Sequence, residues 1–99
     1  MVLQDNPQRH RFEALVDGKV AGYMEYNVLS NALLFSHTEV LPEFEGKGVG
    51  SFLVRESFDA ARKAGKRVIP ACPFVAGYLR KHRELLDAVD DDVQRAYRI

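Results

Sequence analysis

The sequence predicts one α/β domain with a mixed sheet: three antiparallel strands, a helix, a parallel fourth strand and a second helix. Residues 10–41 alternate like strands and contain two turn signals, whereas residues 49–79 hold two helix-like segments on either side of a short apolar run. A chain of 99 residues has the length of one small domain. We therefore expect a single domain over residues 1–99, with its ordered core over residues 10–89.

The antiparallel part follows a polar stretch, residues 1–9, which we expect to form a loose lead-in. Residues 10–16 then alternate between apolar and polar side chains, as a half-buried strand does. Asp17-Gly18 is a dipeptide typical of a tight hairpin. Residues 20–28, rich in β-branched and aromatic side chains, should return antiparallel to the first strand.

A second turn at Ser30-Asn31 leads into a third strand over residues 32–41, which Pro42 ends. The segment from Val49 to Ala64 has apolar side chains at the helical period, and Gly65 is a natural C-terminal stop. A helix between two strands makes them parallel neighbours with a right-handed crossover.

The fourth strand covers residues 67–72, a short apolar run. Pro73 is suited to the first position of the next helix, which extends to Leu79. We expect further helical turns over residues 84–89. The aspartate run at positions 90–92 should be exposed, or could dock a basic partner, and the sequence assigns no element to residues 90–99.

The composition excludes several classes of protein. Apolar residues make up 46% and charged residues 28%, which argues against disorder. Fourteen basic residues balance fourteen acidic ones, so net charge gives no reason to expect binding to nucleic acid or to a membrane surface. The single cysteine cannot form an internal disulfide, and the cysteine and histidines lack the spacing of a metal site. We expect a cytoplasmic protein without a resident metal or a membrane span.

Three glycines, Gly46, Gly48 and Gly50, lie between the third strand and the first helix. Glycine permits sharp turns and keeps side chains out of the path of a ligand. The free amides and positive dipole at the start of a helix make such a loop a phosphate site. The spacing fits neither a P-loop nor a dinucleotide fingerprint. The alternative is a tight turn that binds nothing.

The segment from Val40 to Gly50 reads Val-Leu-Pro-Glu-Phe-Glu-Gly-Lys-Gly-Val-Gly and is followed by Ser51-Phe52-Leu53. It resembles the acetyl-CoA motif of the GCN5-related N-acetyltransferase (GNAT) superfamily, V-x-P-x-x-[QR]-x-x-G-x-[GA]. The segments His37 to Val40 and Ile69 to Phe74 resemble a group of short GNAT-like proteins. The resemblance covers roughly residues 10–89.

The resemblance implies a minimal GNAT-like fold that uses acetyl-CoA as a cosubstrate and binds its pyrophosphate with loop amides. The implied binding residues are Val40, Leu41, Glu45, Gly46, Lys47, Gly48, Val49, Gly50 and Ser51. Glu45 departs from the motif, which has Gln or Arg there, so we expect its side chain to point to solvent. The chain also has no sequence for the flanking elements that shape the acceptor pocket in larger members, so CoA binding is better supported than any acceptor.

Cys72 is the first candidate for chemistry, because it ends the predicted fourth strand where Pro73 opens a helix. A helix N-terminus stabilises a thiolate and raises the reactivity of the thiol. By the resemblance, Cys72 lies near the acetyl thioester and could carry the acetyl group as a covalent intermediate. The alternative is a small buried core residue.

His37 and Glu39 share one face of the third strand, which makes His37 a candidate general base for Cys72 or for an incoming amine. The alternative is a polar pair on a solvated face. By resemblance, Tyr78 could protonate the leaving CoA thiolate, or it could pack in a stripe with Phe74. Lys47 is the preferred partner for the 3′-phosphate of CoA, ahead of three other cations, Arg80, Lys81 and Arg83.

These features favour an acetyltransferase that moves the acetyl group from acetyl-CoA to an unidentified amine or thiol, as a monomer or homodimer. One alternative is a non-catalytic CoA or acetyl-CoA sensor or adaptor. The other is a protein-interaction domain without a nucleotide ligand.

Overall fold

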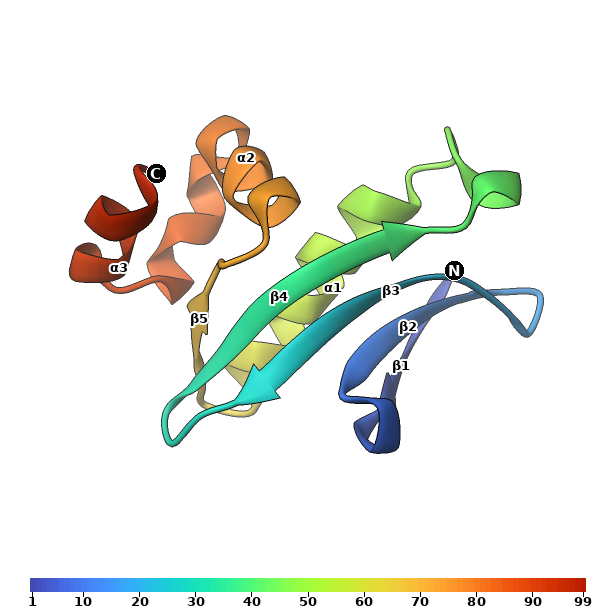
Figure 1. Ribbon diagram of the computed structural model, residues 1–99, viewed down its shortest axis with the longest axis horizontal. Coiled ribbons are helices and arrows are strands. Elements are labelled where there is room, and N and C mark those ends of the chain that lie inside the picture. The colour runs from blue at the N-terminus through green and yellow to red at the C-terminus, as the bar shows by residue number, and fades with distance from the viewer.

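The computed structural model describes residues 1–99 and contains a five-stranded sheet in the order β1-β2-β3-β4-β5 (Figure 1). The strands are β1 (Val2–Asn6), β2 (Arg11–Val16), β3 (Lys19–Val28), β4 (Ala32–Val40) and β5 (Arg67–Ile69). The helices are α1 (Val49–Lys63), α2 (Pro73–Lys81) and α3 (Asp91–Tyr97), with 3-10 helices η1 (Pro7–Arg9), η2 (Pro42–Phe44) and η3 (Arg83–Ala88). No helix combines the length and the apolar character needed to cross a membrane.

The mixed sheet predicted from the sequence is confirmed. Strands β1 to β4 pair antiparallel, and β5 pairs parallel with β4 after the crossover through α1. The β2–β3 turn has φ of 51° at Asp17 and 78° at Gly18, so both central residues are left-handed, as the predicted hairpin requires. The fourth predicted strand is shorter than expected: it ends at Ile69, since Pro70 has no N–H to continue the ladder.

The prediction of a loose lead-in over residues 1–9 is wrong. Residues 2–6 form β1, which pairs along its whole length with β2, and η1 makes the connection. The hydroxyl of Tyr26 on β3 also donates to the carboxylate of Asp5 at 2.6 Å. Pairing with a neighbouring strand, rather than local pattern, makes this polar segment a strand.

The aspartates at positions 90–92 are exposed, as expected, but the segment after residue 89 is an ordered element that the sequence did not indicate. Asp91–Tyr97 forms α3, and Asp90 accepts a hydrogen bond from Arg67 of β5 at 2.7 Å. The guanidinium of Arg80 donates to the carbonyl oxygens of Tyr97 and Arg98. The tail is therefore attached both to the sheet and to α2, and ordered elements extend beyond residues 10–89 at both ends.

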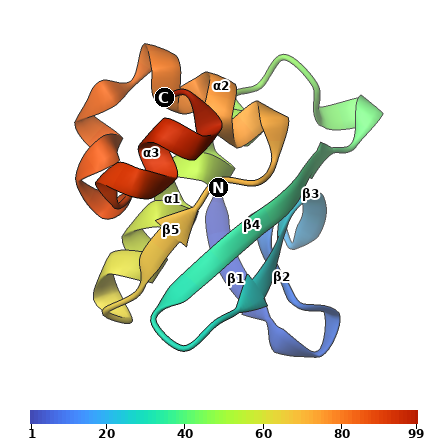
Figure 2. The ribbon, with the colours of Figure 1, turned by 60° about the vertical axis from the view of Figure 1, so that its left-hand side comes forward.

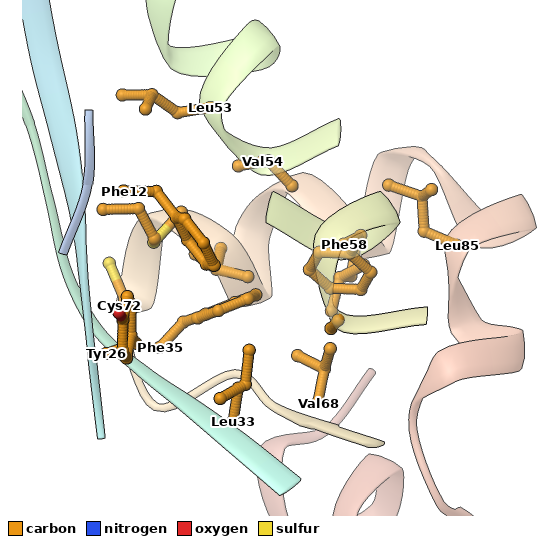
Figure 3. Packing of buried hydrophobic residues seen from close by; sticks show 14 of the residues in the cluster. Phe12, Tyr26, Leu33, Phe35, Leu53, Val54, Phe58, Val68, Cys72 and Leu85 are labelled. Carbon is orange, nitrogen blue, oxygen red and sulfur yellow. The ribbon is translucent and has the colours of Figure 1, made fainter. Parts of the chain in front are cut away.

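The core lies between α1 and the sheet (Figure 3). Phe35 of β4 and Phe58 of α1 are fully buried, with ring centroids 5.7 Å apart. Side chains from α2 and η3, Val75, Leu79 and Leu85, join the same cluster. The helices thus gather on one side of the sheet (Figure 2), and polar side chains such as Arg11, Glu25 and His37 lie on the outer face.

The two parallel strands separate after a short contact. β5 pairs only with Ala32 to Leu34 of β4, and the amide of Cys72 then donates to the carbonyl of Phe35 at 2.8 Å. The β3–β4 register shifts beside Phe35, where Ser36 is the extra residue. Residues 36–40 of β4 therefore have a strand partner on the β3 side alone.

Candidate functional site

The glycine loop and the start of α1 present an unbroken run of unused amides. None of the backbone N–H groups of residues 46–51 donates a hydrogen bond within the chain, and the first amide to do so is that of Phe52, to Gly48. Gly48 is the N-cap of α1 and has no side chain to cap it. Because α1 has 15 residues, its dipole adds positive potential at this end. Such an end is suited to an anion.

The three glycines serve different purposes. Gly46 and Gly48 have φ of 76° and 80°, the left-handed region that other residues adopt at a cost, and a Cβ at either position would meet nothing within 4 Å. A Cβ at Gly50 would lie 2.9 Å from Cζ of Phe74. The third glycine thus makes room on α1 for the ring of Phe74, whereas the first two shape the loop and keep its surface open.

The charged residues of the site differ in availability. Glu45 is exposed, as its departure from the motif led us to expect, and Lys47 is exposed with its Nζ 5.7 Å from the ring centroid of Phe44. Arg80 binds the C-terminal carbonyls and so is engaged away from the loop. Lys81 lines a groove of about 290 Å³ along α2, together with Pro73, Phe74, Gly77 and Tyr78.

The open edge of β4 leads from the loop towards the start of α2 (Figure 1). Val40 and Leu41 end this edge next to the loop, and both are half-buried. At the other side of the gap, the amides of Phe74 and Val75 in the first turn of α2 make no hydrogen bond within the chain. An extended ligand could therefore run along β4 between two helix N-termini.

Cys72 is the N-cap residue of α2, as predicted, but its side chain is buried. Its Sγ lies 3.5 Å from Oγ1 of Thr38, and that hydroxyl lies 3.2 Å from Sδ of Met24. No basic group contacts the thiol. The structure therefore combines features of both interpretations: the cysteine stands at the separation of β4 and β5, and it packs with the core.

His37 and Glu39 form a pair, with Nε2 of His37 3.0 Å from Oε1 of Glu39. They lie on the outer face of β4, whereas Thr38 between them faces inward to Cys72. His37 therefore does not contact the thiol. Tyr23 of β3 lies beside it, with ring centroids 6.4 Å apart. The pair is open to a molecule that approaches the gap from the outer face.

Tyr78 is the centre of a network that links α2 to the start of α1. Its Oη lies 2.7 Å from Oγ of Ser51 and accepts a hydrogen bond from Nε of Arg55 at 2.8 Å. Arg55 also donates to Glu84 at 2.9 Å, and the His82 ring stacks on Tyr78 with centroids 4.0 Å apart. Tyr78 is thus held by polar contacts as well as by packing.

The sequence analysis identified neither Arg55 nor His82 as a residue of the site. Ser51 and Arg55 are four residues apart, so they share one helix face, and this spacing was the available signal. Hydrogen bonds to Glu84 and Tyr78 raise the pKa of Arg55. A backbone hydrogen bond and the Arg55 contact lower the pKa of Glu84. Both effects favour the ion pair.

Comparisons with known proteins support the fold and indicate a family. A family model described as GCN5-related N-acetyl-transferase matches residues 11–89. The solution NMR structure of a GCN5-like protein from Staphylococcus aureus is similar, with a TM-score of 0.67 and 22% sequence identity. The similarity covers 90% of this chain and 87% of the other, and at this identity it shows the fold. No curated protein matches the sequence.

Proposed function

The chain belongs to the GCN5-related N-acetyltransferase family, and on this premise we propose that it binds acetyl-CoA and transfers the acetyl group to an amine or thiol acceptor. The observation that carries the proposal is the run of six unused amides, residues 46–51, at the start of a long helix beside the open edge of β4.

The donors at the loop fit the diphosphate of CoA. Consecutive amides of residues 46–51 can each donate to a phosphate oxygen, and the α1 dipole favours the negative charge. Lys47 in the loop and Lys81 in the groove along α2 are exposed cations, and either can pair with a 3′-phosphate. Because Glu45 is exposed, its carboxylate can turn away from the anion.

The pantetheine arm of CoA carries two amide groups, and β4 offers matching partners. Residues 36–40 of β4 are bonded on one side by β3 and have no strand on the other. An extended arm can lie there as an additional strand would, with main-chain groups as its partners. This path leads from Val40 and Leu41 to the gap beside Cys72.

For direct transfer, the acceptor nitrogen attacks the acetyl carbonyl, and the bond between that carbon and the CoA sulfur breaks. Tyr78 gives its proton to the departing thiolate, and the nitrogen loses a proton to His37 or to water. Glu39 holds Nε2 of His37, which leaves Nδ1 of the ring to accept that proton. The products are the acetylated acceptor and CoA with a free thiol.

A covalent route through Cys72 is the second branch. Here the cysteine sulfur takes the acetyl group, the CoA sulfur leaves with the thiol proton, and the acceptor then attacks the new thioester. The burial of Cys72 and the lack of a contacting base favour the direct route. We expect Cys72→Ser to retain most of the transfer rate, measured as CoA release with free lysine as acceptor. A loss of more than about a hundredfold, on the scale of a catalytic group, would instead assign the covalent route.

The proposal is tested by calorimetric titration with acetyl-CoA. Wild-type protein should bind, and Gly48→Glu should not, because it puts a carboxylate and a strained residue at the anion site. Gly65→Glu is the matched control: Gly65 has φ of 69°, also has free space around it, and lies at the other end of α1. Absence of binding to the wild type would refute the proposal. Binding without transfer to lysine or cysteine would indicate a non-catalytic CoA-binding module.

A further inference from the structure

Arg55 occupies a position that neither the motif nor the sequence analysis identifies. We propose that Arg55 is a positioning residue for acetyl transfer: its guanidinium fixes the hydroxyl of Tyr78 and stabilises the charge left when Tyr78 gives up its proton. This inference rests on the proposed function, because it assigns a task to Tyr78 in that reaction. It adds a residue from the second turn of α1 to a site otherwise built from loop, strand and α2.

The contacts of Arg55 are directional. Its Nε donates to Oη of Tyr78 at 2.8 Å, and a terminal nitrogen donates to Glu84 at 2.9 Å. The same nitrogen lies 3.3 Å from Nδ1 of His82. Tyr78 belongs to α2, Glu84 to η3, and His82 joins these two elements, so the planar guanidinium connects α1 to both. A surface ion pair alone would not require the Nε contact.

The hydroxyl groups of Tyr78 and Ser51 together have one hydrogen that is not used within the chain. Oη of Tyr78 accepts from Arg55 and shares one further hydrogen bond with Oγ of Ser51. If Ser51 donates, the Tyr78 hydrogen has no acceptor in the chain; if Tyr78 donates, the Ser51 hydrogen has none. Either way, one hydroxyl hydrogen remains for a bound molecule, next to the free amide of Ser51.

The positive charge on Arg55 favours release of the Tyr78 proton. When Tyr78 releases its proton, a negative oxygen remains 2.8 Å from a positive nitrogen. A hydrogen bond between charged groups is stronger than one between neutral groups, so the contact strengthens as the proton leaves. Interactions that strengthen during the reaction accelerate it.

Two neighbours keep Arg55 and Tyr78 in place. The His82 ring stacks on Tyr78 at an interplanar angle of 24°, which fixes the plane of the phenol. Glu84 holds the other side of the guanidinium and lies 3.9 Å from Nδ1 of His82. These are the charged groups in contact with Arg55 from the elements packed against it.

The chain offers a matched control on the same helix. Arg62 of α1 pairs with Asp87 of η3 at 2.7 Å, so it also joins α1 to η3, but it does not contact Tyr78. Arg62→Gln therefore removes a comparable ion pair and leaves the proposed site intact. A difference between Arg55→Gln and Arg62→Gln reports on Tyr78 rather than on the attachment of η3.

The kinetic test measures CoA release from acetyl-CoA with free lysine as acceptor. We expect Arg55→Gln to lower kcat by about ten- to a hundredfold, the usual scale of a lost charged hydrogen bond, with KM for acetyl-CoA changed less than threefold. Arg55→Lys should recover part of the rate, and Arg62→Gln should match the wild type. In a Tyr78→Phe background, Arg55→Gln should have no further effect on kcat. Equal effects of Arg55→Gln with and without Tyr78 would overturn the proposal.

A second measurement is independent of activity. Proton NMR reports the ring-current shift of His82 that arises from its stack on Tyr78. We expect this shift to diminish in Arg55→Gln and to persist in Arg62→Gln. An unchanged shift in Arg55→Gln would overturn the positioning role even if no acetyl transfer were found. Conversely, failure of acetyl-CoA to bind, with the shift lost as expected, would refute the proposed function and not the contact.

Discussion

The two ends of α1 are opposites in how their backbone groups are used. At the C-terminal end, the amides of Ala64, Gly65 and Lys66 all donate to carbonyls of the last turns, and Nζ of Lys66 donates to the carbonyls of Leu29 and Ser30. At the N-terminal end, the amides of residues 46–51 donate to nothing in the chain. Both ends carry a left-handed glycine, Gly48 and Gly65, so the turn residue alone does not make the difference.

What differs is the direction of the helix: its last amides donate to carbonyls of the preceding turn, whereas its first amides have no preceding helical turn to donate to. The C-terminal end lies against the β3–β4 hairpin, where β4 and β5 are paired. At the N-terminal end, neither the loop nor a neighbouring element supplies an acceptor to the amides of residues 46–51. Unsatisfied donors at a surface are available to a ligand. The comparison therefore favours the N-terminal end of α1 for the proposed binding, whereas the other end, about 22 Å away for 15 residues, anchors the helix to the hairpin.

The largest effect should come from removing the core that both ends share. Phe58 is fully buried against Phe35, so Phe58→Ala leaves a cavity between α1 and the sheet. We expect a loss of about 3–5 kcal/mol in the free energy of unfolding, measured by urea denaturation. A loss below about 1 kcal/mol would mean that the core does not connect the two ends as described.

A smaller loss of stability should come from a substitution at Gly22, which lies beneath the N-terminal end of α1 only. A Cβ at Gly22 would lie 2.5 Å from the carbonyl oxygen of Glu39, and also close to Val49 and Leu53 of α1. We expect Gly22→Ala to cost about 1–3 kcal/mol of unfolding free energy by overpacking. Gly77→Ala is the control, since Gly77 lies in α2 with nothing within 4 Å and alanine favours a helix. Equal stability of the two variants would show that α1 can shift away from the sheet.

A paired substitution sharpens the comparison between the two ends. Gly48→Ala and Gly65→Ala each force alanine into the left-handed region, so each should cost about 1–2 kcal/mol of unfolding free energy. Acetyl-CoA affinity, measured by calorimetry, should fall for Gly48→Ala and stay unchanged for Gly65→Ala. If both variants weakened binding equally, the ends would not be functionally distinct.

The smallest predicted effect is on the pH dependence of stability, and it comes from Tyr26 in the sheet rather than from the proposed binding site. Burial, together with the hydrogen bond to Asp5, raises the pKa of Tyr26 above the ordinary value of about 10. Above that pH the unfolded chain loses the tyrosine proton while the folded chain keeps it, so stability falls as pH rises. Tyr26→Phe should flatten this alkaline decline in urea unfolding curves. An unchanged slope would mean that Tyr26 titrates alike in both states.

The sequence was sufficient wherever local chemistry decides the structure. Asp17-Gly18 predicted its hairpin, and Gly46 and Gly48 predicted an open strand-to-helix loop, because left-handed backbone favours those residues. It was insufficient for β1, a polar edge strand that depends on pairing with β2. The same holds for α3, which Arg67 and Arg80 attach to the rest of the chain.

Within the candidate site, spacing predicted the pair of His37 and Glu39 but not what lies opposite to it. The side chain that reaches Cys72 is Thr38, since alternate residues of a strand face opposite sides. The contact of Arg55 with Tyr78 depends on how α1 and α2 pack against each other, and no local pattern encodes that. Such contacts appear only when the whole fold is known.

The central claim is that unused amides at one end of α1 bind the acetyl-CoA anion. Nitrogen-15 correlation spectra recorded during titration with acetyl-CoA test it directly, because each backbone amide gives its own signal. We expect saturable shifts for the amides of residues 46–51 and none for Ala64, Gly65 and Lys66. Unmoved signals for residues 46–51, or larger shifts at the C-terminal end of α1, would contradict the account.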